Sequence, residues 1–500
     1  MPVKRDFVGV NLLHLTKMEE IGRLRLRMGR KTAYNKTHTR IFYRFIFGKG
    51  AARMITDMTE GRPGRILWRF ALPVLCSVAF QQMYQIADSV IAGRCVGGAA
   101  LAAIGASYPV TMLFMAVATG LNLGCSVAVS QLFGAREMER MKTAVSTSVL
   151  STLAVSLLLM GFGLFYCGGM LRGLQTDSHI FSDATLYLRI YLYGLPFLFL
   201  YNICTGIFNA LGDSRTPLYF LIASSVANVA LDYIFVAFFS MGVAGVAWAT
   251  FLAQGAASLL ALVTLLCRLR RMECGRFALF SGMMLVRVAG LAVPSILQQS
   301  FISVGNLFIQ WLVNGYGWAV VGGFSAAMKL NNFVIVGLTA LGSAMSSFAA
   351  QNIGASRYDR VNEGLRAGIR MSVGVAVPFS LVFALGGTFM MRLFVNASEP
   401  EVIAAGAVFL RMVAPFYAVI SLKLCADGVL RGAGAMGPFM ISTFSDLILR
   451  VVLAFLFSGW WGAQGIWASW PVGWAIGTAA SLLFVRAGVW KRRTRLVSGS

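Results

Sequence analysis

The chain has 500 residues, of which 58% are hydrophobic and only 12% are charged. A soluble globular protein is about 45–50% apolar and about 25% charged, so this composition excludes an ordinary soluble domain and indicates an integral membrane protein. The formal net charge of +24 is high enough to suggest nucleic acid, but the basic residues gather in the first 56 positions and in short loops. We therefore expect no nucleic-acid partner.

The residues that usually carry chemistry exclude further classes of activity. The eight cysteines are scattered singly and the three histidines lie outside the apolar segments, which indicates neither a disulfide framework nor a zinc site. The sequence contains no GxxxxGK(S/T) motif for nucleotide phosphates. Because no His/Cys/Asp/Glu cluster lies at a membrane face, we expect neither an enzyme nor a resident cofactor.

Residues 1–56 form a strongly basic segment before the apolar part of the chain. Its stretch RLRLRMGRK, at 23–31, lacks the apolar run of about 7–15 residues that a signal peptide requires. We expect a disordered cytoplasmic extension, or a leader that arises from an upstream start codon, with Met54 or Met58 as the true start. The alternative is a surface helix that contacts anionic membrane lipid.

Apolar runs of about 20 residues, each separated by charged residues or by Gly and Pro, predict an all-α protein with twelve transmembrane helices. The predicted spans are 66–93, 103–131, 143–168, 184–210, 217–239, 243–267, 287–314, 324–350, 364–395, 402–429, 436–458 and 463–486.

Most basic residues outside the first segment lie in loops on one side of the predicted bundle. These loops follow the even-numbered spans and hold Arg136, Arg140, Lys142, Arg215, Arg268, Arg270, Arg271, Arg276, Arg357, Arg360 and Arg366, with Lys491, Arg492, Arg493 and Arg495 in a basic tail at 491–500. The loops after the odd-numbered spans hold little beyond Arg94 and Arg172. Because basic loops stay in the cytoplasm, we expect a plasma (inner) membrane protein with both termini cytoplasmic.

The two halves of the chain resemble each other at an offset of 220–222 residues. The matching stretches are SQLFGAREMER (130–140) with AQNIGASRYDR (350–360), FALPVLCSVAFQQ (70–82) with LAVPSILQQSFIS (291–303), and GIFNALGDSRTP (206–217) with GVLRGAGAMGP (428–438). The pattern predicts two six-helix lobes, 57–275 and 276–490, related by a parallel repeat. Two lobes around a central cavity suit alternating access by a monomer.

Two acidic residues fall inside spans of the first lobe, where an uncompensated charge costs about 2.5–3.5 kcal/mol on insertion scales. At about 1.5 Å per residue, Asp88 lies roughly 28 Å along the first span, and Asp232 roughly 22 Å along the fifth. Thr250 lies about 10 Å below the outer surface on the same rule. Asn228 is one helical turn before Asp232. The four residues therefore fall in the outer half of the membrane and supply oxygen ligands.

Such a set favours Na⁺, because hard cations prefer oxygen donors, or alternatively a proton that the two carboxylates share. At the offset of 221, Asp88 corresponds to Ile309 and Asp232 to Leu453. The second lobe lacks these acids, so we expect the two lobes to differ in role. The alternative is that each acid makes only a buried structural hydrogen bond.

The stretch 57–109, which begins DMTEGRPGRILWRFALP, resembles the start of a multidrug and toxic compound extrusion (MATE) transporter, and SQLFGA, ALGDSRTPL and AQNIGA resemble its later motifs. The resemblance covers 57–490. It implies export of amphipathic, often cationic, drugs or metabolites in exchange for Na⁺ or H⁺, and a first-lobe cation site at positions matching Asp88, Asn228, Asp232 and Thr250. Asn209 departs from the family, which usually has arginine there, and a proline often found near 328–350 is missing.

The second lobe carries charges of its own within predicted spans. Lys423 and Asp427 are four residues apart, as are Asp446 and Arg450, and Lys329 lies on the eighth span. We prefer a local ion pair for Asp446 and Arg450. For Lys329, Lys423 and Asp427, the alternatives of local pairing and of contact with substrate stay open. On the first span, Phe80, Gln82 and Met83 are candidate substrate contacts by position.

Other functions are compatible with twelve spans. A flippase for lipid-linked precursors is the main alternative, and it would need a cationic cavity for pyrophosphate and often extra spans. A membrane enzyme would need a catalytic cluster, and a passive channel would need no ion gradient.

Overall fold

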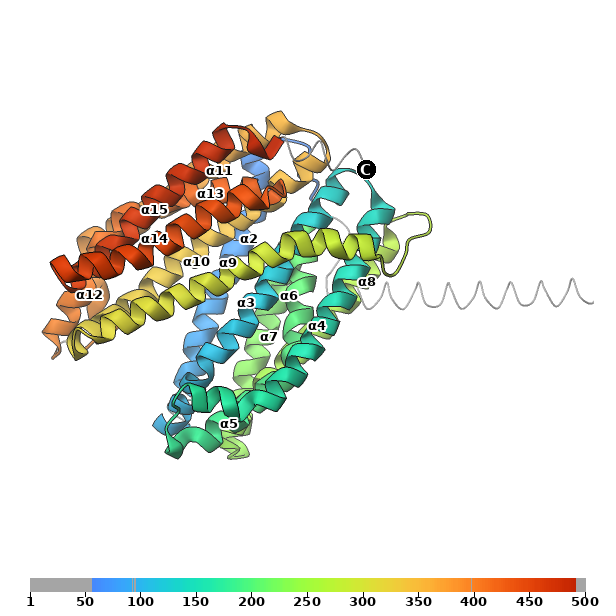
Figure 1. Ribbon diagram of the computed structural model, residues 1–500. Coiled ribbons are helices and arrows are strands. Elements are labelled where there is room, and N and C mark those ends of the chain that lie inside the picture. Colours follow the sequence, from blue (N-terminus) through green and yellow to red (C-terminus); the bar gives the residue numbers. More distant parts are fainter. Residues whose placement is uncertain (1–55, 92, 94–95, 397, 492–500) are drawn as a thin grey trace, which may run out of the picture. The chain divides into compact units, whose positions relative to one another are not determined.

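The computed structural model describes residues 56–91, 93, 96–396 and 398–491. The predictions for residues 1–55 and 492–500 therefore lie outside the described residues. All regular structure in the described part is helical (Figure 1). The first half contains α2 (Pro63–Ile91), α3 (Gly98–Gly134), α4 (Met138–Gly173), α5 (Ser178–Tyr193), α6 (Leu195–Ala210), α7 (Arg215–Tyr233), the π-turn η3 (Ile234–Phe238) and α8 (Gly242–Arg271). The second contains α9 (Gly282–Asn314), α10 (Trp318–Gly354), α11 (Tyr358–Arg392), α12 (Pro400–Val413), the 3₁₀ turn η4 (Ala414–Phe416), α13 (Tyr417–Gly432), α14 (Met436–Trp461) and α15 (Ala463–Arg486).

Eleven described segments are long and apolar enough to cross a membrane, and α5 with α6 makes a twelfth if the bent pair is counted as one span. The multi-pass architecture expected from the sequence is thus present. The predicted span 184–210 is not straight, because its two helices meet at 48° at Gly194. Pro196, in the first turn of α6, lacks the amide hydrogen that would continue the helix of α5.

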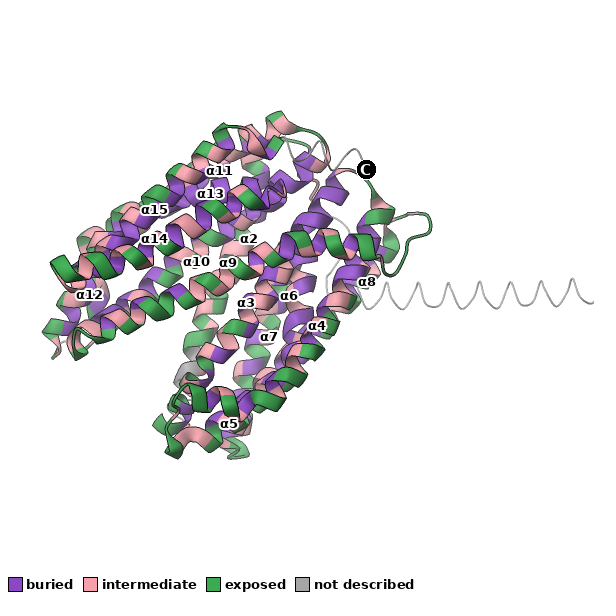
Figure 2. Cartoon of the chain, viewed as in Figure 1, coloured by how far each residue is buried: buried purple, intermediate pink, exposed green. Residues whose placement is uncertain are grey.

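The lipid-facing surface follows from the exposure of large apolar side chains. Leu158 and Phe165 on α4 are 74% and 82% exposed, and Leu385 on α11 is 81% exposed. In water such faces would be costly, whereas acyl chains solvate them. Most of α13 is buried instead, and it is largely purple in Figure 2. The second half therefore has a protein-filled interior behind a lipid-facing shell.

The internal repeat extends to the backbone conformation. Four pairs of residues with positive φ are separated by 220 or 222 positions: Gly97 with Gly317, Arg136 with Ser356, Gly212 with Gly434, and Gly242 with Gly462. The same turns thus end and start equivalent helices in both halves. Arg136 and Ser356 both follow the last turn of a long helix, α3 or α10. The six-helix halves are therefore two copies of one scaffold.

The first helix of each half contacts both lobes. Helix α2 packs against α7 of its own half and against α10 and α11 of the other, while α9 packs against α14 and also against α3 and α4. In Figure 1, α9 runs as a long yellow helix between the green and the red groups. A movement of α2 or α9 therefore changes contacts in both halves of the chain.

The two halves join at one end through a reciprocal pair of glutamines, which we call the glutamine clasp (Gln131, Gln351 and the carbonyls that they bind). The Gln131 side-chain amide donates to the Gly432 carbonyl at 2.8 Å, and the Gln351 amide donates to the Ala210 carbonyl at 2.7 Å. Each bond runs from a long helix of one lobe to a helix end of the other. The clasp follows the repeat, because its donors and acceptors are separated by 220 and 222 positions.

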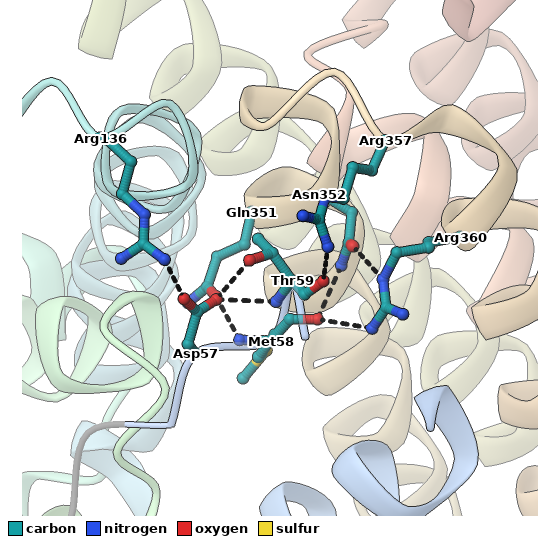
Figure 3. A network of polar contacts seen from close by, with 8 residues as sticks. All are labelled: Asp57, Met58, Thr59, Arg136, Gln351, Asn352, Arg357 and Arg360. Carbon is teal, nitrogen blue, oxygen red and sulfur yellow. Dashed lines mark hydrogen bonds and ion pairs between the residues drawn. The ribbon is translucent and has the colours of Figure 1, made fainter. Parts of the chain in front are cut away.

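The segment Asp57–Thr59, just before α2, reinforces the clasp on both sides (Figure 3). Asp57 forms an ion pair with Arg136 of the first lobe. The Met58 amide donates to Gln351 Oε1 at 3.0 Å, and the Met58 carbonyl accepts from Asn352 at 3.1 Å, both from the second lobe. Burial by itself would raise the pKa of Asp57, but hydrogen bonds from Thr59 and the charge of Arg136 outweigh it and lower the pKa. Asp57 therefore stays ionised and paired at neutral pH.

Gly354→Ala tests how closely the two lobes approach at the clasp. A Cβ at Gly354 would overlap the Gln131 carbonyl, which is backbone and cannot turn aside. We expect a loss of about 1–3 kcal/mol and a lower apparent unfolding temperature in detergent. Gly374→Ala on exposed α11 is the control, because open space surrounds that position. Equal unfolding temperatures for the two variants would contradict the close approach.

Candidate functional site

The structure brings together the four first-lobe residues that the sequence singled out. Asp88 comes from α2, Asn228 and Asp232 from α7, and Thr250 from α8. The carboxyl groups of Asp88 and Asp232 are in hydrogen-bonding contact. Asp232 is fully buried and Asn228 is 3% exposed. Three helices that are separate in sequence therefore meet at one polar point inside the first lobe.

Asn228 connects the site to α2 and α8. With its amide nitrogen turned toward the acid, it donates to Asp232 Oδ2 at 3.0 Å and to the Tyr84 hydroxyl at 2.9 Å, and its oxygen accepts from the Thr250 amide at 3.1 Å. We adopt this orientation because the opposite one would set the amide oxygen against acceptors. One side chain then fixes the relative positions of all three helices.

Two tyrosines complete the site and were not predicted from the sequence. Tyr84 lies one turn before Asp88 on α2 and hydrogen-bonds Thr250, and Tyr187 on α5 lies close to both acids. The spacing of Tyr84 from Asp88 was available as a signal, since residues four apart share a helix face. Tyr187 has no such signal. The bend at Gly194 changes the direction of the chain, so the sequence does not predict which face of α5 is turned toward the acids.

The two acids have unused capacity to bind. Asp88 Oδ1 and Asp232 Oδ1 are buried without a hydrogen-bond partner, and within the described residues neither carboxylate has a basic side chain in an ion pair with it. The two carboxylates and the hydroxyls of Tyr84 and Thr250 supply oxygen atoms that fit one hard monovalent cation or one shared proton, while the Asn228 amide nitrogen holds Asp232 in place. The described residues contain no group of three His, Cys, Asp or Glu side chains that could hold a metal ion.

Two local features of the fold surround this point. A narrow crevice between α5, α6 and α8 reaches the site at Tyr187 and Thr250, and it is also lined by Ile190, Tyr191, Gly194, Leu198, Ala247, Phe251 and Gln254. One residue beyond α7, the π-turn η3 widens the helix directly after Asp232 and Tyr233. Such turns are frequent at functional sites because they leave backbone groups less tightly paired.

The candidate substrate residues fall into two groups. On α2, Phe80 and Met83 are exposed and Gln82 is half-buried, and Lys329 on α10 is also exposed. Lys423 and Asp427 are instead buried in the second lobe and paired with each other at 2.8 Å. The ion pair preferred for Asp446 and Arg450 does not form. Asp446 Oδ2 lies 3.6 Å from the ammonium of Lys423, on the neighbouring helix α13, instead.

Comparisons with known proteins agree with this architecture. The family model MatE matches residues 73–234 and 294–456. The probable multidrug resistance protein YpnP of Bacillus subtilis is 31% identical over 87% of this chain and 97% of its own length. The multidrug export protein MepA of Staphylococcus aureus (strain NCTC 8325 / PS 47) is 21% identical over 84% of this chain and 93% of its own length. The solved outward-facing structure of a multidrug resistance MATE family transporter superposes with a TM-score of 0.81 at 21% identity, covering 89% of this chain and 99% of the other.

Asp88→Asn tests whether the acid pair binds an ion at all. If it does, Na⁺ or acid should raise the apparent unfolding temperature of the purified protein. At an ion concentration of 100 times the dissociation constant, the folded state gains about 2.7 kcal/mol. We expect Asp88→Asn to abolish that response, because Asp232 alone supplies only one of the two carboxylates that bind the ion. Asp359→Asn, an exposed acid on α11, is the control and should respond as the unaltered protein does. A response that persists in Asp88→Asn would place the ion elsewhere.

Proposed function

Because the chain belongs to the MATE family of multidrug transporters, we propose that it is a secondary active antiporter that exports amphipathic, often cationic, drugs or metabolites in exchange for Na⁺ or H⁺. The observation that carries the coupling is the contact of Asp88 and Asp232, with one buried, unpartnered oxygen on each. Such a pair is costly in a membrane protein unless an ion or proton compensates it. Binding of a cation or a proton therefore stabilises the acid pair.

The proposed transport cycle uses the two lobes as rigid halves. The glutamine clasp lies among the loops that carry Arg136 and Arg357, and basic loops are retained in the cytoplasm. In this proposal the structure is closed toward the cytoplasm, and both termini of a monomeric protein in the plasma (inner) membrane face that side. Transport then requires the clasp to open when the substrate enters and to close again after it.

Helix α2 is the proposed link between the ion and the substrate. It carries Asp88 and Tyr84 toward α7, and it packs against α10 and α11 of the other lobe. Phe80 lies one turn before Tyr84 on the same face of α2, and Met83 lies on the same helix, so both move with the helix that carries the acid. A cation that binds one arrangement of α2 more tightly than the other shifts the population toward that arrangement. No cofactor takes part in this cycle.

The alternative of a lipid-linked precursor flippase has less support. It needs free cationic side chains for a pyrophosphate group, and the sequence offered Lys329 and Lys423 as deep candidates. Lys423 is committed to Asp427 and Asp446, which leaves Lys329 as the exposed member of that pair of lysines. A single lysine compensates only part of the negative charge of a diphosphate.

Transport in proteoliposomes tests the antiport. With the Na⁺ and pH gradients set separately, we expect one of them to drive a fluorescent amphipathic cation across the membrane. Asp88→Asn and Asp232→Asn should each lower that driven flux to the level of protein-free liposomes, since the site can no longer exchange its ion. Asp359→Asn should transport normally. Undiminished gradient-driven flux in both site variants would refute the coupling role of the acids.

A cross-link across the clasp tests the alternating access. Ala135 and Ala355 follow the two helix ends that meet there, so cysteines at both positions, in a chain without its native cysteines, can be joined by a short bifunctional thiol reagent. We expect the joined protein to lose transport, because its lobes cannot separate, and each single-cysteine variant to keep it after the same treatment. Full transport by completely cross-linked protein would show that this end need not open.

A further inference from the structure

The second lobe contains a buried pair of acids that is arranged differently from the pair in the first. The Lys423 ammonium on α13 lies 2.8 Å from Asp427 Oδ2 on the same helix and 3.6 Å from Asp446 Oδ2 on α14. Lys423, Asp427 and Asp446 are 3%, 4% and 5% exposed. The ammonium thus lies between two carboxylates in the protein interior.

Hydroxyl groups extend this arrangement into an oxygen-lined pocket. Asp427 Oδ1 accepts from Ser442 on α14 at 3.2 Å and from Ser481 on α15 at 2.5 Å. Both serines are fully buried. Two carboxylates flank the ammonium, and two hydroxyls from α14 and α15 bind the other oxygen of Asp427, so oxygen groups from three helices gather at this point. This is the ligand chemistry of a hard monovalent cation.

Two further observations indicate that the pocket is incomplete as a structural ion pair. Asp446 Oδ1 is buried with no hydrogen-bond partner. Arg450, one turn along α14, does not pair with it, and its guanidinium lies 4.4 Å from the centre of the Trp470 ring instead. Asp446 therefore has an oxygen to spare although a second cation is near.

The lysine stem has a space made for it by a glycine of α15. A Cβ at Gly477 would lie 2.7 Å from Lys423 Cε and 2.8 Å from Asp446 Cβ, which is too close for either group to remain in place. The first lobe differs, because Asp88 and Asp232 meet with no basic side chain paired to them among the described residues.

We propose that Asp427, Asp446, Ser442 and Ser481 form a second cation site, which the chain's own Lys423 ammonium fills permanently. Lys423 is a tethered counter-cation that keeps Na⁺ and protons out of this pocket. The ligand class of the uncovered site is a monovalent cation, or a small alkylammonium ion in place of the lysine head. Combined with the proposed function, on which this last step depends, only the first lobe exchanges an ion during transport.

The test uses the full chain with Asp88→Asn and Asp232→Asn, so that the first-lobe site contributes no ion response. Lys423→Met is added to this background, because methionine keeps much of the stem and loses the charge. The apparent unfolding temperature in detergent is then measured against Na⁺ at constant ionic strength, with choline as replacement, and against pH. We expect Na⁺ or acid to raise it by several degrees in the Lys423→Met protein and not in its Lys423 parent.

A matched control removes the pocket's own charge. Lys423→Met combined with Asp427→Asn and Asp446→Asn should show no gain from Na⁺ or acid. A gain of equal size there, or none in Lys423→Met alone, would overturn the proposal. If Lys423→Met is recovered folded only when Na⁺ or acid is present, the proposal is supported. If it never folds while the control variant does, no external cation can replace the lysine and the proposal fails.

Lys423→Ala provides a second measurement, which tests directly whether the pocket binds a small cation. This change leaves room for a small amine between the carboxylates, so methylammonium should raise the unfolding temperature of Lys423→Ala and methanol should not. Equal effects of the two additives would contradict a charge-selective pocket. Because both readouts are stabilities in a background without the first-lobe acids, they are independent of whether the chain proves to be an antiporter.

Discussion

Compensation of carboxylates in a medium of low dielectric constant is the constraint on which the rest of this structure depends. Each lobe brings two acids together within its apolar helices, and an unpaired charge in a membrane interior is unfavourable by several kcal/mol. The second lobe meets the constraint with its own lysine, at 2.8 and 3.6 Å. The first lobe brings Asp88 and Asp232 together and leaves one oxygen of each without a partner. The second lobe therefore carries a counter-charge of its own, whereas the acid pair of the first lobe has none among the described residues.

This difference is built on a scaffold that the two halves share. The paired turns at Gly97 and Gly317, or at Gly242 and Gly462, adopt the same unusual backbone conformation 220 positions apart. The side chains that carry charge do not follow the repeat, since Asp88 and Asp232 correspond to Ile309 and Leu453. The shared backbone keeps the lobes geometrically matched where they meet, while their interiors are free to carry different chemistry.

Sequence reasoning succeeded where one helix or one regular rise per residue determines the answer. The rise of a helix placed Asp88, Asp232 and Thr250 at similar depths, and the structure has all three at one point. It failed where a neighbouring helix decides. Asp446 and Arg450 have the spacing of a local pair, yet Lys423 from α13 lies beside the acid and Trp470 beside the base.

Tyr187 was missed because a bend of 48° at Gly194 separates the register of α5 from that of α6. The sequence motifs that contain Gln131 and Gln351 revealed a repeat, but no single-chain pattern says that two copies of a motif touch.

The clasp between the lobes is made of amides and carbonyls, and water satisfies such groups almost as well as protein does. A typical exchange of this kind changes the free energy by only about 0.5–1.5 kcal/mol per bond. The two glutamine bonds therefore specify the alignment in which the halves meet without making separation expensive. A junction built from buried hydrocarbon of the same area would hold far more strongly and would wet poorly on opening. In the proposed transport cycle, polar side chains at this seam would let the lobes close in one register and open again at a modest cost in free energy.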